Sequence, residues 1–187
     1  MKTMKISLLA GMSLAILAVH SRAVSQVRRV ESIKDSSSIT YILNHPLHTI
    51  EAVSREGSFR ADVDTAARQI QSVTAQADVM SFDSGNSNRD SHAMEVIDAI
   101  SYPDVVFSST HISPIGDSLL VTGILDFHGM ADSITATMHP KWTPGELDVA
   151  GGFNLSLTAF KIDRPSLLMI PVSDTLRFEL RAVFDLR

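Results

Sequence analysis

Cysteine is absent from the 187-residue sequence. Its absence excludes disulfide bonds, thiol catalysis, thiolate metal sites and the attachment of a lipid anchor to an N-terminal cysteine. Small secreted domains often depend on disulfides because their cores are small. A chain of this length can bury a sizeable core, so we expect the core alone to hold the fold together.

Lysine and arginine are few and form no cluster interleaved with aromatic residues. The sequence has 16 basic and 21 acidic residues, which gives a formal net charge of -5. Phosphate contacts need a basic face, so this charge balance predicts that the protein does not bind nucleic acid.

The common motifs of catalysis are missing as well. There is no Gly-x-Ser-x-Gly turn, no glycine-rich phosphate loop and no His-Glu-x-x-His pattern. Serines are plentiful, but a Ser-His-Asp hydrolase needs a strand-to-helix turn that presents its nucleophile. We therefore predict that the protein is not an enzyme, and we assign no catalytic residue and no cofactor.

Long apolar runs are confined to the N-terminus. Lys2 and Lys5 precede an uncharged stretch at positions 6–19. A helix that spans a bilayer needs about 20 apolar residues, so this stretch is too short. A basic start, a short apolar run and small residues after it are typical of a secretory signal peptide. An uncleaved anchor or a buried core helix is the alternative.

Two positions fit cleavage of such a signal, one after Ala23 and one after Ser25. We therefore predict a signal peptide at residues 1–25 and a mature domain at residues 26–187. The prediction places the protein in the periplasm or outside the cell. No second long apolar run follows, so we expect no transmembrane segment in the mature form.

Apolar and polar residues alternate with a period of two through most of the mature sequence, as in half-buried strands. In the last such segment Leu176, Phe178 and Leu180 face one way, and Arg177 and Glu179 face the other. Turn residues separate the segments, and short links favour antiparallel neighbours. About eight strands are predicted, enough to close into a barrel that holds one ligand. They lie at 38–44, 58–64, 72–82, 105–112, 118–127, 133–139, 147–157 and 175–184.

One segment breaks this pattern and predicts a short helix between strands. Asn88 or Asp90 can cap it, and apolar residues then recur at helical spacing up to Ile100. Tyr102 precedes Pro103, and the residue before a proline disfavours helix. Such a helix can plug one end of a barrel.

From this helix onward the sequence resembles a known family. Gly-Asn-Ser-Asn-Arg-Asp-Ser-His at 85–92 is followed by Tyr-Pro-Asp-Val-Val-Phe-Ser-Ser-Thr at 102–110. Gly123, Leu125 and Gly129 then match a Gly-x-Leu-x-x-x-Gly hairpin. In order and spacing these motifs resemble the YceI-like family of exported lipid-binding proteins. The resemblance covers the chain from about Ser37 to its end.

The resemblance implies an all-β fold: an elongated, antiparallel, eight-stranded lipocalin-like barrel with a long apolar interior. It also implies that the protein carries or sequesters an isoprenoid, a quinone-type lipid or a fatty amphiphile inside the barrel. The alternative is an exported barrel with a filled core that holds no ligand and binds a protein partner. A homodimer is left open.

Two segments depart from the family pattern. Positions 45–51 read His-Pro-Leu-His-Thr-Ile-Glu, and the proline would interrupt a strand. Positions 157–166, which read Leu-Thr-Ala-Phe-Lys-Ile-Asp-Arg-Pro-Ser, replace an Arg-x-x-Phe-Gly stretch. We expect both segments near a barrel end.

The inward faces of the predicted strands supply candidate ligand-binding residues. Small side chains such as Ala61, Ala75 and Ala77 leave room where leucine or phenylalanine would fill it. A filled core is the better explanation of any single residue, and a cavity is favoured for the group. Arg89 can donate to oxygens of a ligand head group, but a helix start explains Arg89 and Asp90 without a ligand. The candidates are Phe59, Val73, Ala75, Phe107, Leu125, Phe153 and Leu155 for the wall, with Arg89 and His92 near the mouth.

His45 and His48 have a spacing that can serve a metal ion. No clear third ligand accompanies them, and Pro46 lies between them. A surface pair of histidines in a loop is the simpler interpretation, so we assign no metal site.

Overall fold

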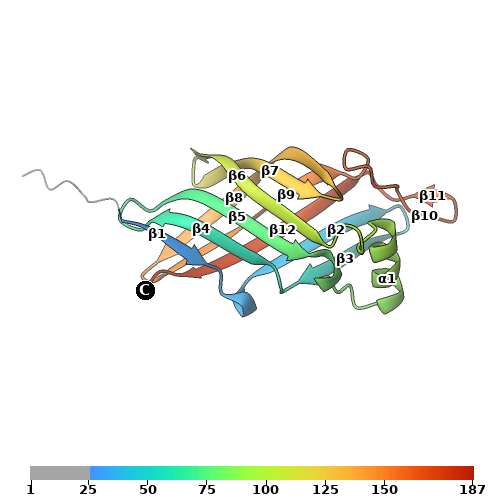
Figure 1. Ribbon diagram of the computed structural model, residues 1–187, viewed down its shortest axis with the longest axis horizontal. Helices are drawn as coiled ribbons and strands as arrows, with labels where there is room; N and C mark the ends of the chain where they lie inside the picture. The colour runs from blue at the N-terminus through green and yellow to red at the C-terminus, as the bar shows by residue number, and fades with distance from the viewer. Residues whose placement is uncertain (1–25) are drawn as a thin grey trace, which may run out of the picture.

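Ten antiparallel strands form one curled sheet in the computed structural model, which describes residues 26–187 (Figure 1). The signal peptide predicted at residues 1–25 lies outside the described residues. The sheet order is β1-β4-β5-β6-β7-β8-β9-β12-β2-β3. The strands are β1 (Val27–Glu31), β2 (Ser38–His45), β3 (His48–Ser54), β4 (Ser58–Asp64), β5 (Gln69–Asp78), β6 (Asp104–Ile115), β7 (Ser118–Phe127), β8 (Met130–Thr143), β9 (Glu146–Ser156) and β12 (Thr175–Asp185).

The all-β antiparallel fold predicted from the sequence is confirmed, and each of the predicted strands corresponds to one strand of this sheet. Two strands were not predicted. In β1 only Val30 is buried, so no alternation marks it. β3 follows Pro46, which does not lie within a strand but in the turn that joins β2 to β3. A separate small hairpin pairs β10 (Ser166–Leu167) with β11 (Ile170–Pro171).

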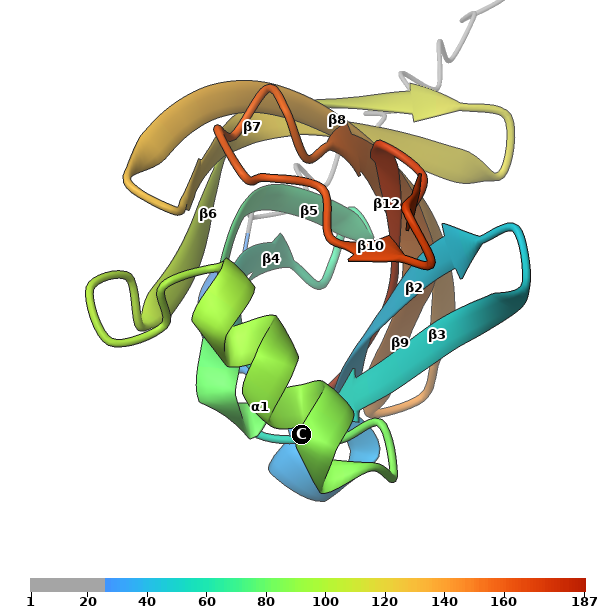
Figure 2. The same cartoon turned by 90° about the vertical axis from the view of Figure 1, so that its right-hand side faces the viewer.

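Contacts at both ends draw the edges of the sheet together. Ser32, just after β1, forms a bridge with Phe184 of β12. At the other end Val53 of β3 forms a bridge with Asp83, which follows β5. The 3-10 helix η1 (Lys34–Ser36) connects β1 to β2 beside β12. These links curl the sheet around an apolar interior. Figure 2 shows the curled sheet from the end that carries α1.

One short helix, α1 (Ser87–Val96), lies across one end of the barrel (Figure 2). Asn86 caps it, since its side chain accepts a hydrogen bond from the Arg89 amide at 3.1 Å. The predicted caps Asn88 and Asp90 are therefore wrong, because both lie within the helix. The predicted strand 72–82 is also too long: it ends at Asp78, and the 3-10 helix η2 (Val79–Ser81) follows.

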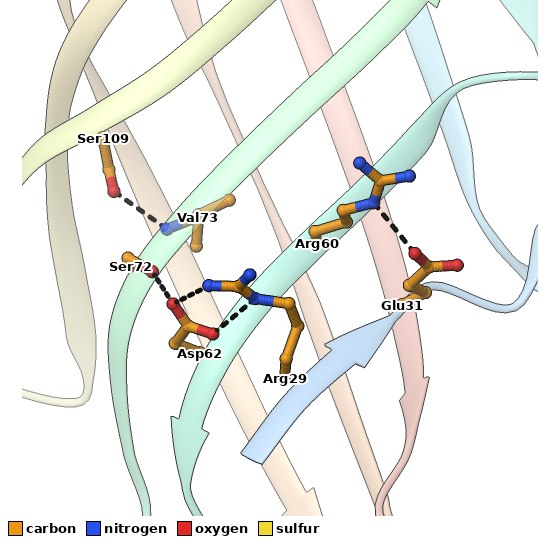
Figure 3. Close-up of polar contacts among 7 residues, drawn as sticks. All are labelled: Arg29, Glu31, Arg60, Asp62, Ser72, Val73 and Ser109. Atoms are coloured by element: carbon orange, nitrogen blue, oxygen red, sulfur yellow. Dashed lines mark hydrogen bonds and ion pairs between the residues drawn. The ribbon is translucent and has the colours of Figure 1, made fainter. Parts of the chain in front are cut away.

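Ion pairs on the outer face tie the edge strand β1 to β4 (Figure 3). Arg29 donates two hydrogen bonds to the Asp62 carboxylate at 2.9 and 3.0 Å, and Ser72 donates a third at 2.8 Å. The hydrogen bonds from Arg29 and Ser72 hold the pKa of Asp62 below its usual value. A second pair joins Arg60 to Glu31. Both Arg28 and Arg29 belong to the edge strand β1.

An Asp62→Asn substitution is expected to lower the free energy of unfolding at pH 7 by a few tenths of a kcal/mol, up to about 1 kcal/mol, the usual range for exposed ion pairs. A lowered pKa in the folded state stabilises the protein above the unfolded pKa of about 3.9. This stabilisation is lost as the pH falls through the folded-state pKa. Urea unfolding of both proteins at pH 7 and at pH 3 measures the difference. If the difference in unfolding free energy between the two proteins is as large at pH 3 as at pH 7, the lowered pKa of Asp62 is not its cause.

Candidate ligand cavity

The apolar interior consists of two clusters that meet near the middle of the barrel. Three half-buried rings, Phe107, Phe153 and Phe178, pack against both clusters. The first cluster fills the end near β1, and its buried members are Val30, Ile39, Phe59, Ala61, Val63, Ala77, Val121, Ala136, Met138, Leu147, Val149, Ala182 and Phe184. The second lies at the α1 end, and its buried members are Val79, Ala99, Leu125, Phe127, Leu155, Leu157, Phe160, Ile162, Val172 and Leu176.

A cavity of about 210 Å³ opens at the α1 end of the barrel and reaches Ile39, Ala77 and Ala136 of the first cluster. Its walls come from the inward faces of β2, β5, β6, β7, β8, β9 and β12, and α1 contributes Ala93, Met94 and Val96. Nearly all of the lining side chains are apolar. The exceptions stand at the α1 end or on β5, and they are Tyr41, Gln76, Arg89, Asp90 and His92.

The structure brings seven of the nine candidate residues together around this cavity. Ala75, Phe107, Leu125, Phe153 and Leu155 line its wall, and Arg89 and His92 lie on the side of α1. Phe59 and Val73 do not line it. Both pack into the filled cluster, where Phe59 is only 5% exposed. Alternation identifies the inward face of a strand, but it does not show how far along the barrel a residue lies.

Arg89 and Asp90 fix the loop that begins the helix. Arg89 donates from Nε to the Ser84 hydroxyl at 2.8 Å and from Nη2 to the Ser84 carbonyl at 2.7 Å. The Asp90 carboxylate accepts hydrogen bonds from both the amide and the hydroxyl of Ser84. These bonds support the structural interpretation, in which the two side chains fix the start of α1. His92 is largely exposed, with Nδ1 3.8 Å from Glu95.

Tyr41 is a polar residue of the cavity that the sequence reasoning missed. Its ring contacts Phe82, with ring centroids 5.4 Å apart, and its side chain lines the cavity. Burial raises the pKa of its phenol, and the nearby Asp90 carboxylate raises it further, while Arg89 opposes the change. Within residues 26–187 no group forms a hydrogen bond with the Tyr41 hydroxyl. The hydroxyl is therefore free to bind a polar group of a ligand.

The segment at 157–166 also contributes to the cavity. Leu157, Ile162 and Pro165 line it, and both Leu157 and Ile162 are buried. The Leu157 carbonyl accepts hydrogen bonds from the amides of Phe160 and Ile162, which fold the segment back over the barrel end. The alternation on 38–44 points Tyr41 inward, so the sequence contained the signal for that residue. No periodic pattern marked 157–166.

The histidine pair is occupied by structural contacts. His45 and His48 face each other across the β2–β3 pair, with ring centroids 5.2 Å apart. His45 Nδ1 accepts a hydrogen bond from the Leu47 amide at 3.2 Å, so its Nε2 carries the hydrogen and donates to the Ile170 carbonyl at 3.0 Å. Both ring nitrogens of His45 are thus used. Among the described residues no three metal-binding side chains come together.

A second hollow lies on the outer face over β8, β9, β12 and β2, with a volume of about 590 Å³. It is wide open to solvent, and charged side chains such as Arg177, Glu179 and Arg181 line it together with Gly152. Although its volume is larger, it lacks the enclosed apolar wall that an apolar ligand needs.

Three solved structures show the same fold. The Burkholderia cenocepacia protein BcnA is 22% identical, with a TM-score of 0.74 over 81% of this chain and 98% of that one. The Campylobacter jejuni YceI protein is 13% identical, with a TM-score of 0.67 over 95% and 99%. A domain from Saccharophagus degradans is described as polyisoprenoid-binding and implicated in plant cell wall breakdown. It is 10% identical, with a TM-score of 0.61 over 86% and 99%.

A search of curated proteins finds no match to the chain. Within residues 26–187 no helix is long and apolar enough to cross a membrane. The model of the YceI-like domain matches residues 31–184, which include all of the sheet except the first four residues of β1 and the last residue of β12. The resemblance inferred from the motifs at 85–129 is confirmed, and the chain belongs to the YceI-like family.

Proposed function

We propose that this protein binds one apolar or amphiphilic molecule in the cavity and acts as a carrier or a sequestering protein. The observation that carries the proposal is an apolar cavity, partly covered by α1, whose charged groups all lie at the α1 end. Apolar cavities in proteins stay dry and bind apolar molecules. A ligand would place its tail among Leu125, Phe127 and Leu155 and its polar head near the charged side chains at the α1 end.

An isoprenoid or a fatty chain is the ligand class that this cavity fits best. A polyisoprenoid is what the S. degradans domain is described as binding. Export to the periplasm or the exterior belongs to the same proposal, and the basic start and short apolar run at positions 1–19 support it.

Binding rather than catalysis is proposed because of how the titratable cavity residues are placed. Arg89 and Asp90 are both bound to Ser84, and His92 is largely exposed. General acid–base catalysis needs such groups to reach a bound substrate, and here the main pair is held in the helix-starting loop. The filled cluster near β1 would suit a ligand-free interaction module, but the cavity at the α1 end favours the carrier.

Native mass spectrometry of the protein purified from cells without detergent tests the proposal. We expect a population heavier than the bare chain, and extraction with organic solvent should release a lipid that accounts for the difference. Protein stripped in this way should bind added farnesol. A bare mass, an empty extract and no binding of farnesol together would overturn the proposal.

A further inference from the structure

We propose that Phe107, Phe153 and Phe178 form the floor of the cavity and set the longest tail that the protein can enclose. The inference rests on the proposed function and narrows its ligand class. The ligand would then have a short tail, or it would be a long polyisoprenoid of which only the end enters the barrel.

The three rings lie where the cavity meets the first cluster, from which Ile39, Ala136 and Leu180 also reach the cavity. All three line the cavity, and they are the half-buried residues that pack against both clusters. Phe153 of β9 and Phe178 of β12 are partners in the sheet register. Their rings stack, with centroids 5.0 Å apart and planes inclined by 15°.

Phe107 completes the floor from β6. Its ring lies over Gly123 of β7, where a Cβ would come within 2.5 Å of the ring atom Cζ. The ring therefore packs directly on the backbone of the neighbouring strand. Because Gly123 has no side chain, the Phe107 ring can lie directly against β7. Any other residue at position 123 would displace the ring.

The interior on the far side of the floor is filled. Phe59, Met138 and Leu147 are buried there and do not line the cavity. Gly151 leaves space that Met138 occupies, since a Cβ at Gly151 would lie 2.8 Å from the Met138 Sδ atom. Thioether side chains fill irregular gaps well. A tail cannot pass this region unless several packed side chains move.

The volume of the cavity agrees with a short tail. Pockets that bury most of a drug-sized ligand have volumes of about 300–1,000 Å³, and this cavity has about 210 Å³. An engineered apolar cavity of about 150 Å³ holds benzene. Once a tail reaches the floor, each further methylene stays in water and adds no affinity.

Binding of linear primary alcohols from hexanol to hexadecanol tests the floor. Their affinities are measured by displacement of a fluorescent apolar dye. In the wild-type protein we expect the affinity to rise roughly fourfold per methylene up to a certain chain length and then to level off. We call this chain length the break. Phe178→Ala should move the break to longer alcohols. Phe59→Ala makes the same truncation in the filled cluster and should leave the break in place.

Phe153→Leu keeps the proposal testable if Phe178→Ala fails to fold, since it removes less volume and should shift the break by a smaller step. Affinity that rises without a break up to hexadecanol would overturn the floor. So would a break that stays fixed in the folded floor variants, and in both cases the carrier function would survive. If no alcohol binds at any length, the carrier function fails and the floor fails with it.

Discussion

An Ala75→Phe substitution is expected to reduce the affinity for an apolar ligand at least 100-fold while leaving the protein as stable as the wild type or more stable. Ala75 lies on β5 between Phe59 of β4 and Phe107 of β6 in the sheet register. Its methyl group lines the cavity. A phenyl ring at this position would occupy the space that a ligand tail needs. A 100-fold loss corresponds to about 2.7 kcal/mol of binding free energy.

The effect on stability has the opposite sign because the new ring fills empty apolar space. Substitutions that fill cavities commonly add about 0.5–2 kcal/mol to the free energy of unfolding. Titration with farnesol measures the affinity, and urea unfolding of the ligand-free protein measures the stability. A variant that keeps the wild-type affinity would show that the ligand binds elsewhere.

Ala61→Phe is the matched control on the neighbouring strand. Ala61 also faces inward, but it is 2% exposed and does not line the cavity. A ring has no free space there, so we expect a loss of about 1–3 kcal/mol in the free energy of unfolding. The same chemical change should therefore stabilise the protein at the cavity wall and destabilise it at a filled position of the same cluster. Equal losses at the two sites would contradict the division of the interior into a cavity and a filled cluster.

The strands could be predicted because alternation is strong wherever one face is buried. The edge strand β1 buries only Val30, and the ion pairs of Arg29 and Glu31 that hold it in place leave no periodic pattern in the sequence. β3 was not predicted because Pro46 was expected to interrupt a strand. A proline disfavours only the interior of a strand, and Pro46 lies in the hairpin turn before β3. Both misses are edge features, where pairing depends on long-range contacts rather than on local periodicity.

The ligand site could be predicted only in part, for a geometric reason. A period of two places Phe59 and Val73 on the inner face as firmly as it places Leu125. Which of them reach the cavity depends on where each strand lies along the barrel, and this follows from the register with its neighbours. Similarly, the Arg-Asp sequence at 89–90 is compatible with a ligand contact as well as with a helix start, which needs no ligand. The hydrogen bonds to Ser84 favour the helix start.

The Gly-x-Leu-x-x-x-Gly hairpin that carried the resemblance now has a physical explanation. Gly123 allows the ring of Phe107 to lie on β7. Leu125, the next inward-facing residue of β7, lines the cavity. Gly129 adopts a left-handed conformation, with φ at 67°, in the turn that joins β7 to β8. A Cβ there would come within 2.6 Å of the Tyr102 ring. The motif thus shapes the cavity floor and the strand connection beside it.

Gly123→Ala is therefore expected to destabilise the protein strongly. The added Cβ would overlap the Ser108 carbonyl oxygen on β6 and the ring of Phe107. The carbonyl belongs to the backbone, so the two paired strands must separate or shift. We expect a loss of about 3 kcal/mol in the free energy of unfolding, at the upper end of the range for overpacked cores. Urea unfolding measures the loss.

Two further variants separate the causes of that loss. Gly116→Ala adds a methyl group where no atom lies within 4 Å, at a φ of 57°, and should cost only the 1–2 kcal/mol or so of a left-handed alanine. Gly123→Ala combined with Phe107→Leu removes the ring contact and keeps the carbonyl contact. If the ring matters, the double variant should lose less than the sum of the single losses. Strictly additive losses would show that Phe107 does not pack on Gly123, and the floor would then need another support on the side of β6.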